Sequence, residues 1–367
     1  MNLSSRPNII VSVVIVALVF SAVGGYTFLT NQYVPPQIGV VVLEPGFGDR
    51  SMADQVLEGL DELAGDAVVN YTYRVADDAD DAQFLLSQMA SAGRFDLIIA
   101  IGDALTDRLQ TVAGTYANQR FACIGGAINA DNVVSATFAQ HQAAFLAGAL
   151  AAFMADNRSG IVGILASRND DPTVTGLIAG FTQGLEEANS TFGLNIGLLP
   201  TEYVGSYNDT DEAYDLALDM WDPSDGNATI IFAPVRASII GVRSAMEYAN
   251  STWFGTMDDR EPFVIAAEGN QDYLGLEDID IRTGDDSWVV TSVVPRTDLA
   301  AYRIVNSTLW DEFEGGEIYR YNLTDGNVNI TDFEFSSSWL TPFIEAQLED
   351  YIDDILNGVI VVDDGSP

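Results

Sequence analysis

Lysine is absent from the 367 residues, and basic side chains of any kind are scarce. The chain has 15 arginines against 54 aspartates and glutamates, which gives a formal net charge of −39. So large a negative charge repels phosphate groups, and the composition therefore argues against nucleic acid and anionic lipid as partners. The acidic residues are spread along the chain, as in 77–81, 209–212 and 258–261. This distribution is typical of the hydrated acidic surface of salt-adapted proteins, and also of any solvated face without a specific role.

Cysteine and histidine each occur once, as Cys123 and His141. A single cysteine forms no internal disulfide, so the core must hold the fold, and we expect Cys123 to lie in it. A single histidine supplies no histidine-rich metal site, and no Gly-x-Ser-x-Gly elbow accompanies it, so we expect it at a helix cap or on the surface. The loop 45–48 lacks the lysine of a P-loop, and acidic pairs such as Asp170-Asp171 lack EF-hand spacing. These absences argue against an enzyme, a cofactor and a bound metal.

The first 36 residues contain a long apolar segment. Residues 9–20 are nearly all apolar, and together with 21–29 they reach about the 20 residues that a membrane-spanning helix needs. Arg6 is the only basic residue before this segment, so the positive-inside rule places the N-terminus in the cytoplasm and the rest outside. The small residues 21–24 also fit the cleavage site of a signal peptide. We therefore expect 1–36 to be a membrane anchor or signal segment with a linker. The rest would lie outside the cell membrane, or be secreted if the segment is cleaved.

Potential N-glycosylation sites are more frequent than chance predicts. After the apolar segment, nine asparagines stand in Asn-x-Ser/Thr sequons, where chance would give roughly two or three. Such sites are glycosylated on the exposed surfaces of exported proteins. An acidic chain without disulfides, with many sequons and an N-terminal anchor, is typical of an archaeal exterior protein. The expected sites are Asn70, Asn157, Asn189, Asn208, Asn227, Asn250, Asn306, Asn322 and Asn329.

Residues 37–63 show the local pattern that the chain then repeats. Residues 38–43 form a nearly continuous apolar, β-branched run, which predicts a strand buried on both faces. A loop with Pro45, Gly46 and Gly48 follows, and apolar residues then recur at helical spacing from Met52. Strand, loop and helix form the first half of a βαβ unit, whose loop lies at the edge where open α/β sheets bind ligands.

Strands and helices alternate along the remaining chain, which predicts parallel sheets covered on both sides. The alternation starts again near residue 160 without an internal sequence repeat, and two facing α/β lobes with a ligand cleft are expected. We assign 37–140 plus about 290–316 to lobe 1, and 141–289 plus about 317–367 to lobe 2. Residues 318–335 are expected to form a β-hairpin turned at Asp325-Gly326.

Several stretches, in a fixed order, resemble one family: the basic membrane protein (BMP) group of extracellular solute-binding lipoproteins. They are IGVVVLEPGFGDRSMADQVLEGL (38–60), FDLIIAIGDALTDRLQTVA (95–113), RFACIGG (120–126), NVVSATFAQHQAAFLAGALAA (132–152), AGFTQGLEEAN (179–189), YVGSYND (203–209) and VVTSVVPRTDLAAYRIV (289–305). The family feeds ABC importers and includes purine-nucleoside receptors. The resemblance implies a type I periplasmic-binding fold, in which two lobes joined by hinge strands close on a small ligand. It also implies an ABC transporter permease as partner.

The positions that bind nucleoside in the family carry different residues in this chain. The sequence 49–53 reads Asp-Arg-Ser-Met-Ala where the family has Asp-Lys-Ser-Phe-Asn, so Met52 replaces a ring that stacks on a base. Leu177 stands in place of a second aromatic ring, Glu268 in place of a shorter acid, and Arg296 beside the place of a lysine. Without the two rings the site loses contacts worth about 1 kcal/mol each.

Residues that directly follow buried strands are further candidates, because loops at strand ends carry function. Asp49 and Arg50 could bind ligand hydroxyls or a carboxylate, or form a salt bridge within the loop. Arg236 could meet an anionic ligand group through two parallel hydrogen bonds, or pair with one of the many carboxylates. Phe47, Tyr207 and Phe138 are the aromatic candidates for stacking. The full candidate set is Phe47, Asp49, Arg50, Met52, Asp103, Phe138, Leu177, Tyr207, Arg236, Glu268, Asn270 and Arg296.

The sequence leads to one main function and two alternatives. We expect an anchored extracellular receptor that binds a small molecule, with a purine nucleoside as the first candidate, and delivers it to an ABC importer by hinge closure. A ligand-sensing ectodomain that signals through a partner is the second reading. A glycosylated surface protein without solute transport is the third.

Overall fold

The computed structural model describes residues 35–65, 69–156, 158–255 and 260–366. A compact unit starts at Pro35. Among the described residues, no helix has the length and apolar character needed to cross a membrane. The anchor or signal segment expected over 1–36 lies outside this part of the chain except for its last two residues, and the sequon at Asn157 lies outside it as well.

The first sheet has six strands in the order β12-β5-β4-β3-β1-β2, and every neighbouring pair is parallel. Helix α8 packs against α1, and α2 packs against α3. The strands are β1 (Gln37–Leu43), β2 (Asn70–Ala76), β3 (Leu97–Ile101), β4 (Phe121–Ile124), β5 (Val133–Phe138) and β12 (Ile318–Tyr321). The helices are α1 (Met52–Gly65), α2 (Ala79–Ser91), α3 (Thr106–Thr115) and α8 (Thr297–Leu309).

The second sheet has the order β13-β11-β10-β9-β6-β7, with the short β8 paired to β6. All pairs are parallel except that of β11 with β13. The strands are β6 (Ile161–Ala166), β7 (Gly197–Leu198), β8 (Glu202–Tyr203), β9 (Ile230–Ala233), β10 (Phe263–Ala267), β11 (Val289–Pro295) and β13 (Val328–Ile330). The helices are α4 (Gln140–Ala155), α5 (Pro172–Phe192), α6 (Thr210–Trp221), α7 (Ile239–Ala249) and α9 (Pro342–Leu356).

The apolar runs become strands because both faces of each sheet are covered. In β1, Ile38, Val40 and Val42 belong to one hydrophobic core, while Val41 belongs to another on the opposite face. The side chains of a strand alternate between its faces, so a strand buried on both sides must be apolar at successive positions. Cys123 is fully buried in β4, which confirms its expected place in the core.

Aspartates begin several helices. Asp78, Asp171 and Asp209 are the N-cap residues of α2, α5 and α6, and their carboxylates accept hydrogen bonds from backbone N–H groups of the first turn. An anion is favoured there because the helix dipole leaves the N-terminus partly positive. Some of the many acidic residues thus fix the starts of helices and are not merely hydrated surface.

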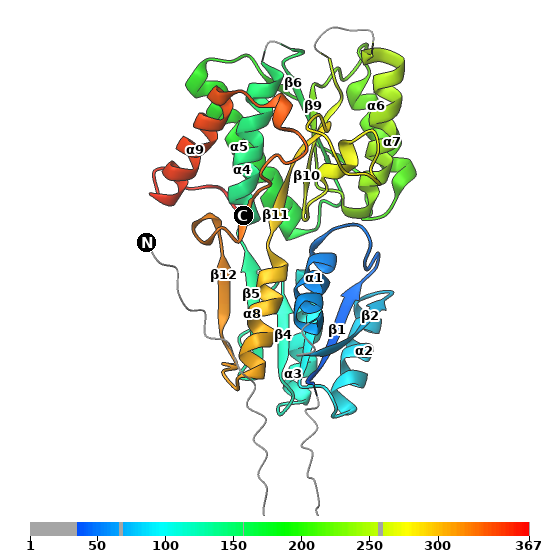
Figure 1. Ribbon diagram of the computed structural model, residues 1–367, viewed down its shortest axis with the longest axis vertical. Coiled ribbons are helices and arrows are strands. Elements are labelled where there is room, and N and C mark those ends of the chain that lie inside the picture. Colours follow the sequence, from blue (N-terminus) through cyan, green and yellow to red (C-terminus); the bar gives the residue numbers. More distant parts are fainter. Residues whose placement is uncertain (1–34, 66–68, 157, 256–259, 367) are drawn as a thin grey trace, which may run out of the picture. The chain divides into compact units, whose positions relative to one another are not determined.

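The chain passes between the two sheets three times (Figure 1): from β5 into α4, from β11 into α8, and from β12 into β13. The expected hairpin over 318–335 is therefore wrong, because β12 pairs with β5 in the first sheet and β13 pairs with β11 in the second. Two strands also differ from the expected lobes. β11 belongs to the second sheet, although 290–316 was assigned to lobe 1, and β12 belongs to the first.

Helices α4 and α5 pack at very short range. A Cβ added at Gly148 would lie 1.9 Å from the carbonyl oxygen of Phe181, and one at Gly184 would lie 1.9 Å from that of Phe145. Real Cβ atoms do not come so close to another atom, so glycine at these positions lets the two backbones touch. The small-residue composition of α4 thus serves this contact.

Gly148→Ala should destabilise the fold by about 1–3 kcal/mol, because the added methyl group overpacks the α4–α5 contact. This loss of stability is expected even though alanine favours helix over glycine by about 1 kcal/mol. Gly114→Ala is the matched control in α3, where an added Cβ meets no atom within 4 Å. Denaturant unfolding of both variants checks this, and equal stability of the two would contradict the assigned contact.

A buried carboxylate joins β11 to β13. Asp272, in the short helix η4 (Asp272–Gly275), accepts hydrogen bonds from the hydroxyls of Ser292 on β11 and Thr331 just after β13. Burial raises its pKa from 3.8 to about 6, and the charges of Asp332 and Glu334 add to the effect. The group therefore lies beside two of the three connections between the sheets.

Raising the pH from 4 to above 6 should lower the free energy of unfolding through Asp272 by up to about 3 kcal/mol. In this window the folded chain holds a proton on Asp272 that the unfolded chain has released, so the contribution is present at pH 4 and lost above pH 6. Asp272→Asn should lack this component. Urea unfolding of both proteins at pH 4.5 and 7.5 measures the difference; the same pH dependence in both would show that Asp272 is not responsible.

Candidate functional site

Charged residues from both sheets meet where the strands end. Asp49 and Asp103 follow β1 and β3 of the first sheet, and Asp171, Arg236 and Glu268 follow β6, β9 and β10 of the second. We call these five residues the polar cluster. Each sheet contributes from its carboxyl edge, which is where open α/β sheets bind ligands.

An ion pair lies at the centre of the polar cluster. Arg236 donates to Oε1 of Glu268 from Nε at 2.8 Å and approaches it from Nη2 at 2.7 Å, while Oδ2 of Asp171 lies 3.6 Å from the same Nη2. Glu268 is 0% exposed. A buried charge requires such a partner, because taking a lone ion out of water is very costly.

The backbone is strained at this ion pair. Arg236 has φ of 50° and Glu268 has φ of 67°, in the left-handed region that residues with side chains rarely adopt. Such conformations cost of order 1 kcal/mol or more each and cluster at functional sites. Arg50, which follows Asp49, also has a positive φ, of 60°.

Tyr207 extends the polar cluster through Asp171. Its hydroxyl donates to Oδ2 of Asp171 at 2.7 Å, and the guanidinium carbon of Arg236 lies 4.2 Å from the centre of its ring. Burial and the bond to Asp171 raise the pKa of the Tyr207 hydroxyl well above its usual range. The Tyr207 ring was expected to stack on a ligand, but one of its faces already contacts Arg236.

Three acids of the polar cluster, Asp49, Asp103 and Glu268, have a raised pKa. Burial raises the pKa of Glu268, against the opposing effect of Arg236, and burial also raises that of Asp49. The pKa of Asp103 is raised first by burial and then by the nearby charge of Asp171. Perturbed carboxylates gathered at one place mark a candidate functional site.

Several buried polar atoms at the site have no hydrogen-bond partner within the described residues. They include one oxygen of each of two acids, Oδ2 of Asp49 and Oε2 of Glu268. Buried polar groups are normally paired, so these oxygens are candidates to accept a hydrogen bond from a ligand or water. The other three, which the sequence interpretation did not select, are Oγ of Ser167, Oγ of Ser238 and Oε1 of Gln271.

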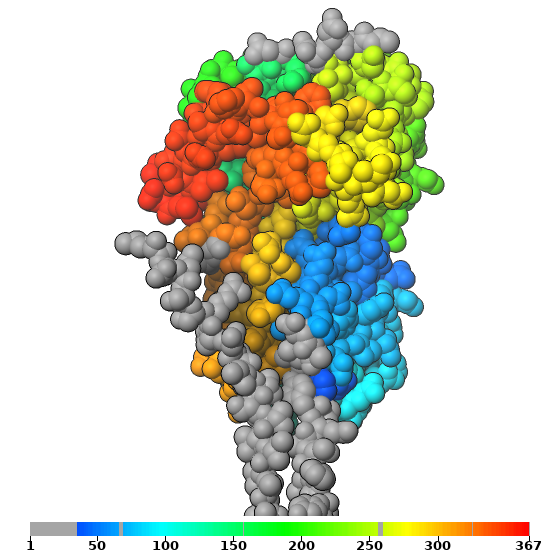
Figure 2. Space-filling view, viewed as in Figure 1, coloured from blue at the N-terminus to red at the C-terminus, as the bar shows by residue number. Residues whose placement is uncertain are grey.

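The two sheets contact each other beside the polar cluster. Nε2 of Gln271 donates to the backbone oxygen of Asp49 at 2.7 Å, and the hydroxyl of Thr173 donates to Oδ2 of Asp103 at 3.5 Å. A Cβ at Gly269 would lie 1.8 Å from the backbone oxygen of Arg50. On the face shown in Figure 2, the yellow region that includes this part of the chain meets the blue start of α1.

A groove of about 550 Å³ lies next to this contact and contains three of the predicted residues, Arg50, Asn270 and Arg296. Both arginines already have acidic partners, because Arg50 lies 3.2 Å from Glu58 and Arg296 lies 2.7 Å from Asp298. The remaining residues that line it are Gln55, Tyr273, Arg282, Val294, Gly326, Asn329, Ile330, Thr331, Asp332, Glu334 and Phe335.

Four predicted residues pack elsewhere. The rings of Phe47 and Phe138 contact those of Tyr73 and Tyr321, with centres 4.7 and 5.3 Å apart. Met52 and Leu177 are buried. Of the sequence-predicted candidates, the structure thus gathers Asp49, Asp103, Arg236, Glu268 and Tyr207 in one place, with Arg50, Asn270 and Arg296 in the adjacent groove.

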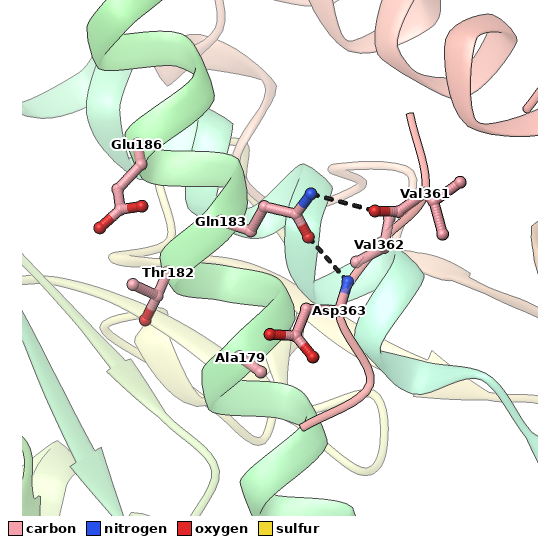
Figure 3. A pocket seen from close by; sticks show the side chains of 7 residues that line it. All are labelled: Ala179, Thr182, Gln183, Glu186, Val361, Val362 and Asp363. Atoms are coloured by element: carbon pink, nitrogen blue, oxygen red, sulfur yellow. Dashed lines mark hydrogen bonds between the residues drawn. The ribbon is translucent and has the colours of Figure 1, made fainter. Parts of the chain in front are cut away.

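A second cavity, of about 510 Å³, belongs to the C-terminal segment (Figure 3). Here the side chain of Gln183 on α5 donates to the backbone oxygen of Val361 at 3.1 Å and accepts from the backbone N–H of Asp363 at 2.7 Å. No predicted site residue lines this cavity. It is a surface hollow where the end of the chain lies along a helix.

The sequence interpretation missed Asp171 as a member of the site. Asp170-Asp171 was weighed only as an acidic pair for calcium, and among the described residues no group of acids, histidine and cysteine is arranged to hold a metal ion. The usable signal was position, since Ser167 to Asp171 directly follow the buried strand β6, just as Arg236 follows β9. Reading every strand end equally would have found it.

Comparison with known proteins identifies the family. Residues 37–364 match the model of a family described as "Bmp: ABC transporter substrate-binding protein PnrA-like". The chain is 26% identical over 300 residues to the "ABC transporter nucleoside-binding protein BmpA" of Lactococcus lactis, covering 78% of each chain. It is 23% identical over 328 residues to an uncharacterized lipoprotein of Pyrococcus abyssi, covering 89% of this chain and 76% of that one.

Solved structures show the same fold. An ABC transporter solute-binding protein of Aeropyrum pernix K1 superposes with a TM-score of 0.77 at 21% identity, covering 89% of this chain and 93% of that one. A solute-binding protein of Conexibacter woesei gives a TM-score of 0.65 at 16% identity, covering 90% and 100%. These likenesses confirm the expected periplasmic-binding-protein-like fold with two α/β lobes. Because the family model spans nearly all of the described chain, this protein belongs to the Bmp family of PnrA-like ABC transporter substrate-binding proteins.

Proposed function

We propose that this chain is an extracellular receptor of an ABC importer and that it holds its solute at the polar cluster, between the two sheets. The observation that carries the proposal is the buried, strained Arg236–Glu268 pair, which leaves Oε2 of Glu268 without a partner. It lies at the carboxyl edge of one sheet and interacts with Asp49 and Asp103 of the other. A strained, buried charge pair at this edge supports ligand binding there, because strained residues cluster at functional sites and open α/β sheets bind ligands at this edge.

Closure of the two lobes about the three connections would trap the solute. The bonds from Gln271 to Asp49 and from Thr173 to Asp103 join opposite sheets, so they exist only while the sheets are close together. A solute that touches both sides adds to these bonds and shifts the population towards the closed form. The permease would then recognise that form. No step in this cycle needs catalysis, and we propose none.

A purine nucleoside is the first neutral solute to test. The nucleoside-binding relative in Lactococcus lactis and the family resemblance support it. The packing of Met52 and Leu177 in the interior does not, because neither side chain supplies a ring to stack on a base. A nucleoside would instead have to bind through the hydroxyl groups of its ribose.

The exterior location is also a proposal. Relatives in three Pyrococcus species are named lipoproteins, which supports attachment to the outside of a membrane. In this chain the one cysteine, Cys123, is buried in β4, so we propose that the apolar residues 9–29 provide the anchor if they are not cleaved. Among the predicted glycosylation sites, Asn70 and Asn208 are exposed, whereas the Asn189 amide donates to the backbone oxygen of Ile196 at 3.4 Å.

Gln271→Ala should raise the dissociation constant of the bound solute about 3- to 10-fold, because it removes a hydrogen bond that the closed form makes and the open form lacks. Calorimetric titration in high salt measures this, and small-angle scattering of the ligand-free variant should show a larger radius of gyration. Gln119→Ala is the control. Its amide donates to Phe95 and Arg120 within the first sheet, so it should change stability without changing affinity.

Two results would contradict the proposed function. The first is the absence of saturable one-to-one binding across nucleosides, sugars, amino acids and amines, which would favour a surface protein that keeps the fold. The second is binding that leaves the radius of gyration unchanged, since a solute held between the sheets must favour the closed form.

A further inference from the structure

When its four acids are ionised, the polar cluster contains more negative charge than its one arginine can balance. Four carboxylates, those of Asp49, Asp103, Asp171 and Glu268, surround Arg236. Glu268 and Asp171 both lie within ion-pair distance of the guanidinium, at 2.7 and 3.6 Å. These two acids belong to the same sheet as Arg236, so its one positive charge is already shared between two carboxylates there. The two acids of the first sheet are left over.

One of the two carboxylate oxygens of Asp49 has no hydrogen-bond partner among the described residues. Its Oδ1 accepts the backbone N–H of Ser51 at 2.9 Å, while its Oδ2 is buried and accepts no hydrogen bond within the described residues. No ion pair with a distance of 4 Å or less joins it to any arginine in that part of the chain. Arg50, the next residue, pairs with Glu58.

Asp103 is in a similar position. Its Oδ1 accepts the backbone N–H of Ala104 at 2.8 Å, and its Oδ2 accepts only the long bond of 3.5 Å from Thr173. It too lacks an ion pair among the described residues. Arg168 is the other arginine near Tyr207, but its Nε and Nη2 already donate to the carboxylate of Asp170, at 2.8 and 2.6 Å.

Most of the buried polar atoms of the site that lack a hydrogen-bond partner among the described residues are acceptors. Glu268 Oε2, Asp49 Oδ2 and Gln271 Oε1 can only accept hydrogen bonds when the acids are ionised, and all three are buried. Glu268 and Gln271 are fully buried, so bulk water does not form hydrogen bonds with their side chains. A ligand that fits must therefore bring several N–H or O–H donors.

We infer that the solute is an organic cation, carrying a protonated amine or a guanidinium group whose N–H groups donate to Asp49 and Asp103 and to the free oxygen of Glu268. This inference rests on the proposed function, because it assumes that the polar cluster is the solute site. It sets the solute class apart from a neutral nucleoside.

Other ligand classes fit less well. An anion would meet four carboxylates and an arginine that is already paired, so the expectation that Arg236 binds an anionic group is not favoured. A neutral polyol supplies donors but no charge, and the two partly buried carboxylates of Asp49 and Asp103 would remain uncompensated in the closed form. A metal ion needs acids at coordination distance, and the described residues contain no such group. The net charge of −39 also draws cations towards the protein.

The test is calorimetric titration of the purified chain with putrescine, spermidine, arginine and lysine, with adenosine and glucose as neutral probes. We expect one of the cations to bind one-to-one, with an affinity that falls as salt is added. Asp49→Asn and Asp103→Asn should each weaken it about 10- to 100-fold, because each removes a charged hydrogen bond. Both substitutions keep the size of the side chain, and circular dichroism and thermal unfolding would confirm that the variants fold.

The control substitution removes the same charge from an exposed position nearby. Asp107→Asn lies four residues after Asp103. It should leave the affinity within about twofold, since surface charges are screened. Equal losses in control and site variants would attribute the effect to net charge and overturn the inference.

The outcomes separate this inference from the proposed function. Binding of adenosine or glucose, but of no cation, overturns the inference and leaves the receptor intact. Binding of a cation that is insensitive to Asp49→Asn and Asp103→Asn also overturns it, because the cation then lies elsewhere. Binding of none of the six probes counts against both.

Discussion

The buried ion pair between Arg236 and Glu268 is the interaction on which the site depends. Glu268 is held entirely away from water, and only the guanidinium 2.7 Å away makes its charge tolerable there. The pair fixes two residues with positive φ at neighbouring strand ends, and Oε2 of Glu268 is left without a hydrogen-bond partner among the described residues. Removing either partner of such a pair costs about 3–5 kcal/mol, so the protein keeps an expensive arrangement at the edge where a ligand would bind.

The fold explains why this pair faces acids from the other half of the chain. Both sheets are mainly parallel, so the carboxyl ends of the parallel strands gather at one edge of each sheet, and the three connections bring those two edges together (Figure 1). β11 is central to this arrangement, because it runs directly into α8 of the other half and is tied to β13 through Asp272. A movement of the halves must therefore bend the chain close to this buried acid.

Much of this was predictable from the sequence, for a simple reason. Buried parallel strands are continuous apolar runs, and the residues after such runs lie at the carboxyl edge of the sheet, where the structure places Asp49, Asp103, Arg236 and Glu268. The separation of β12 from β13 was not predictable. Two short strands around Asp325-Gly326 look like a hairpin, and local turn signals do not say which sheet each strand joins. Nor does sequence reveal that Met52 and Leu177 turn into the core, or which carboxylate oxygen lacks a partner.

A crystal structure of the chain with its tightest-binding solute tests the central claim most directly. The account predicts density for the solute between the sheets, within hydrogen-bond distance of Glu268 and of Asp49 or Asp103. Density in the groove beside Gln55, which is 7% exposed and has no partner for its amide among the described residues, would contradict it. In that case the buried ion pair would only stabilise the fold, and the solute would bind in the groove outside the polar cluster.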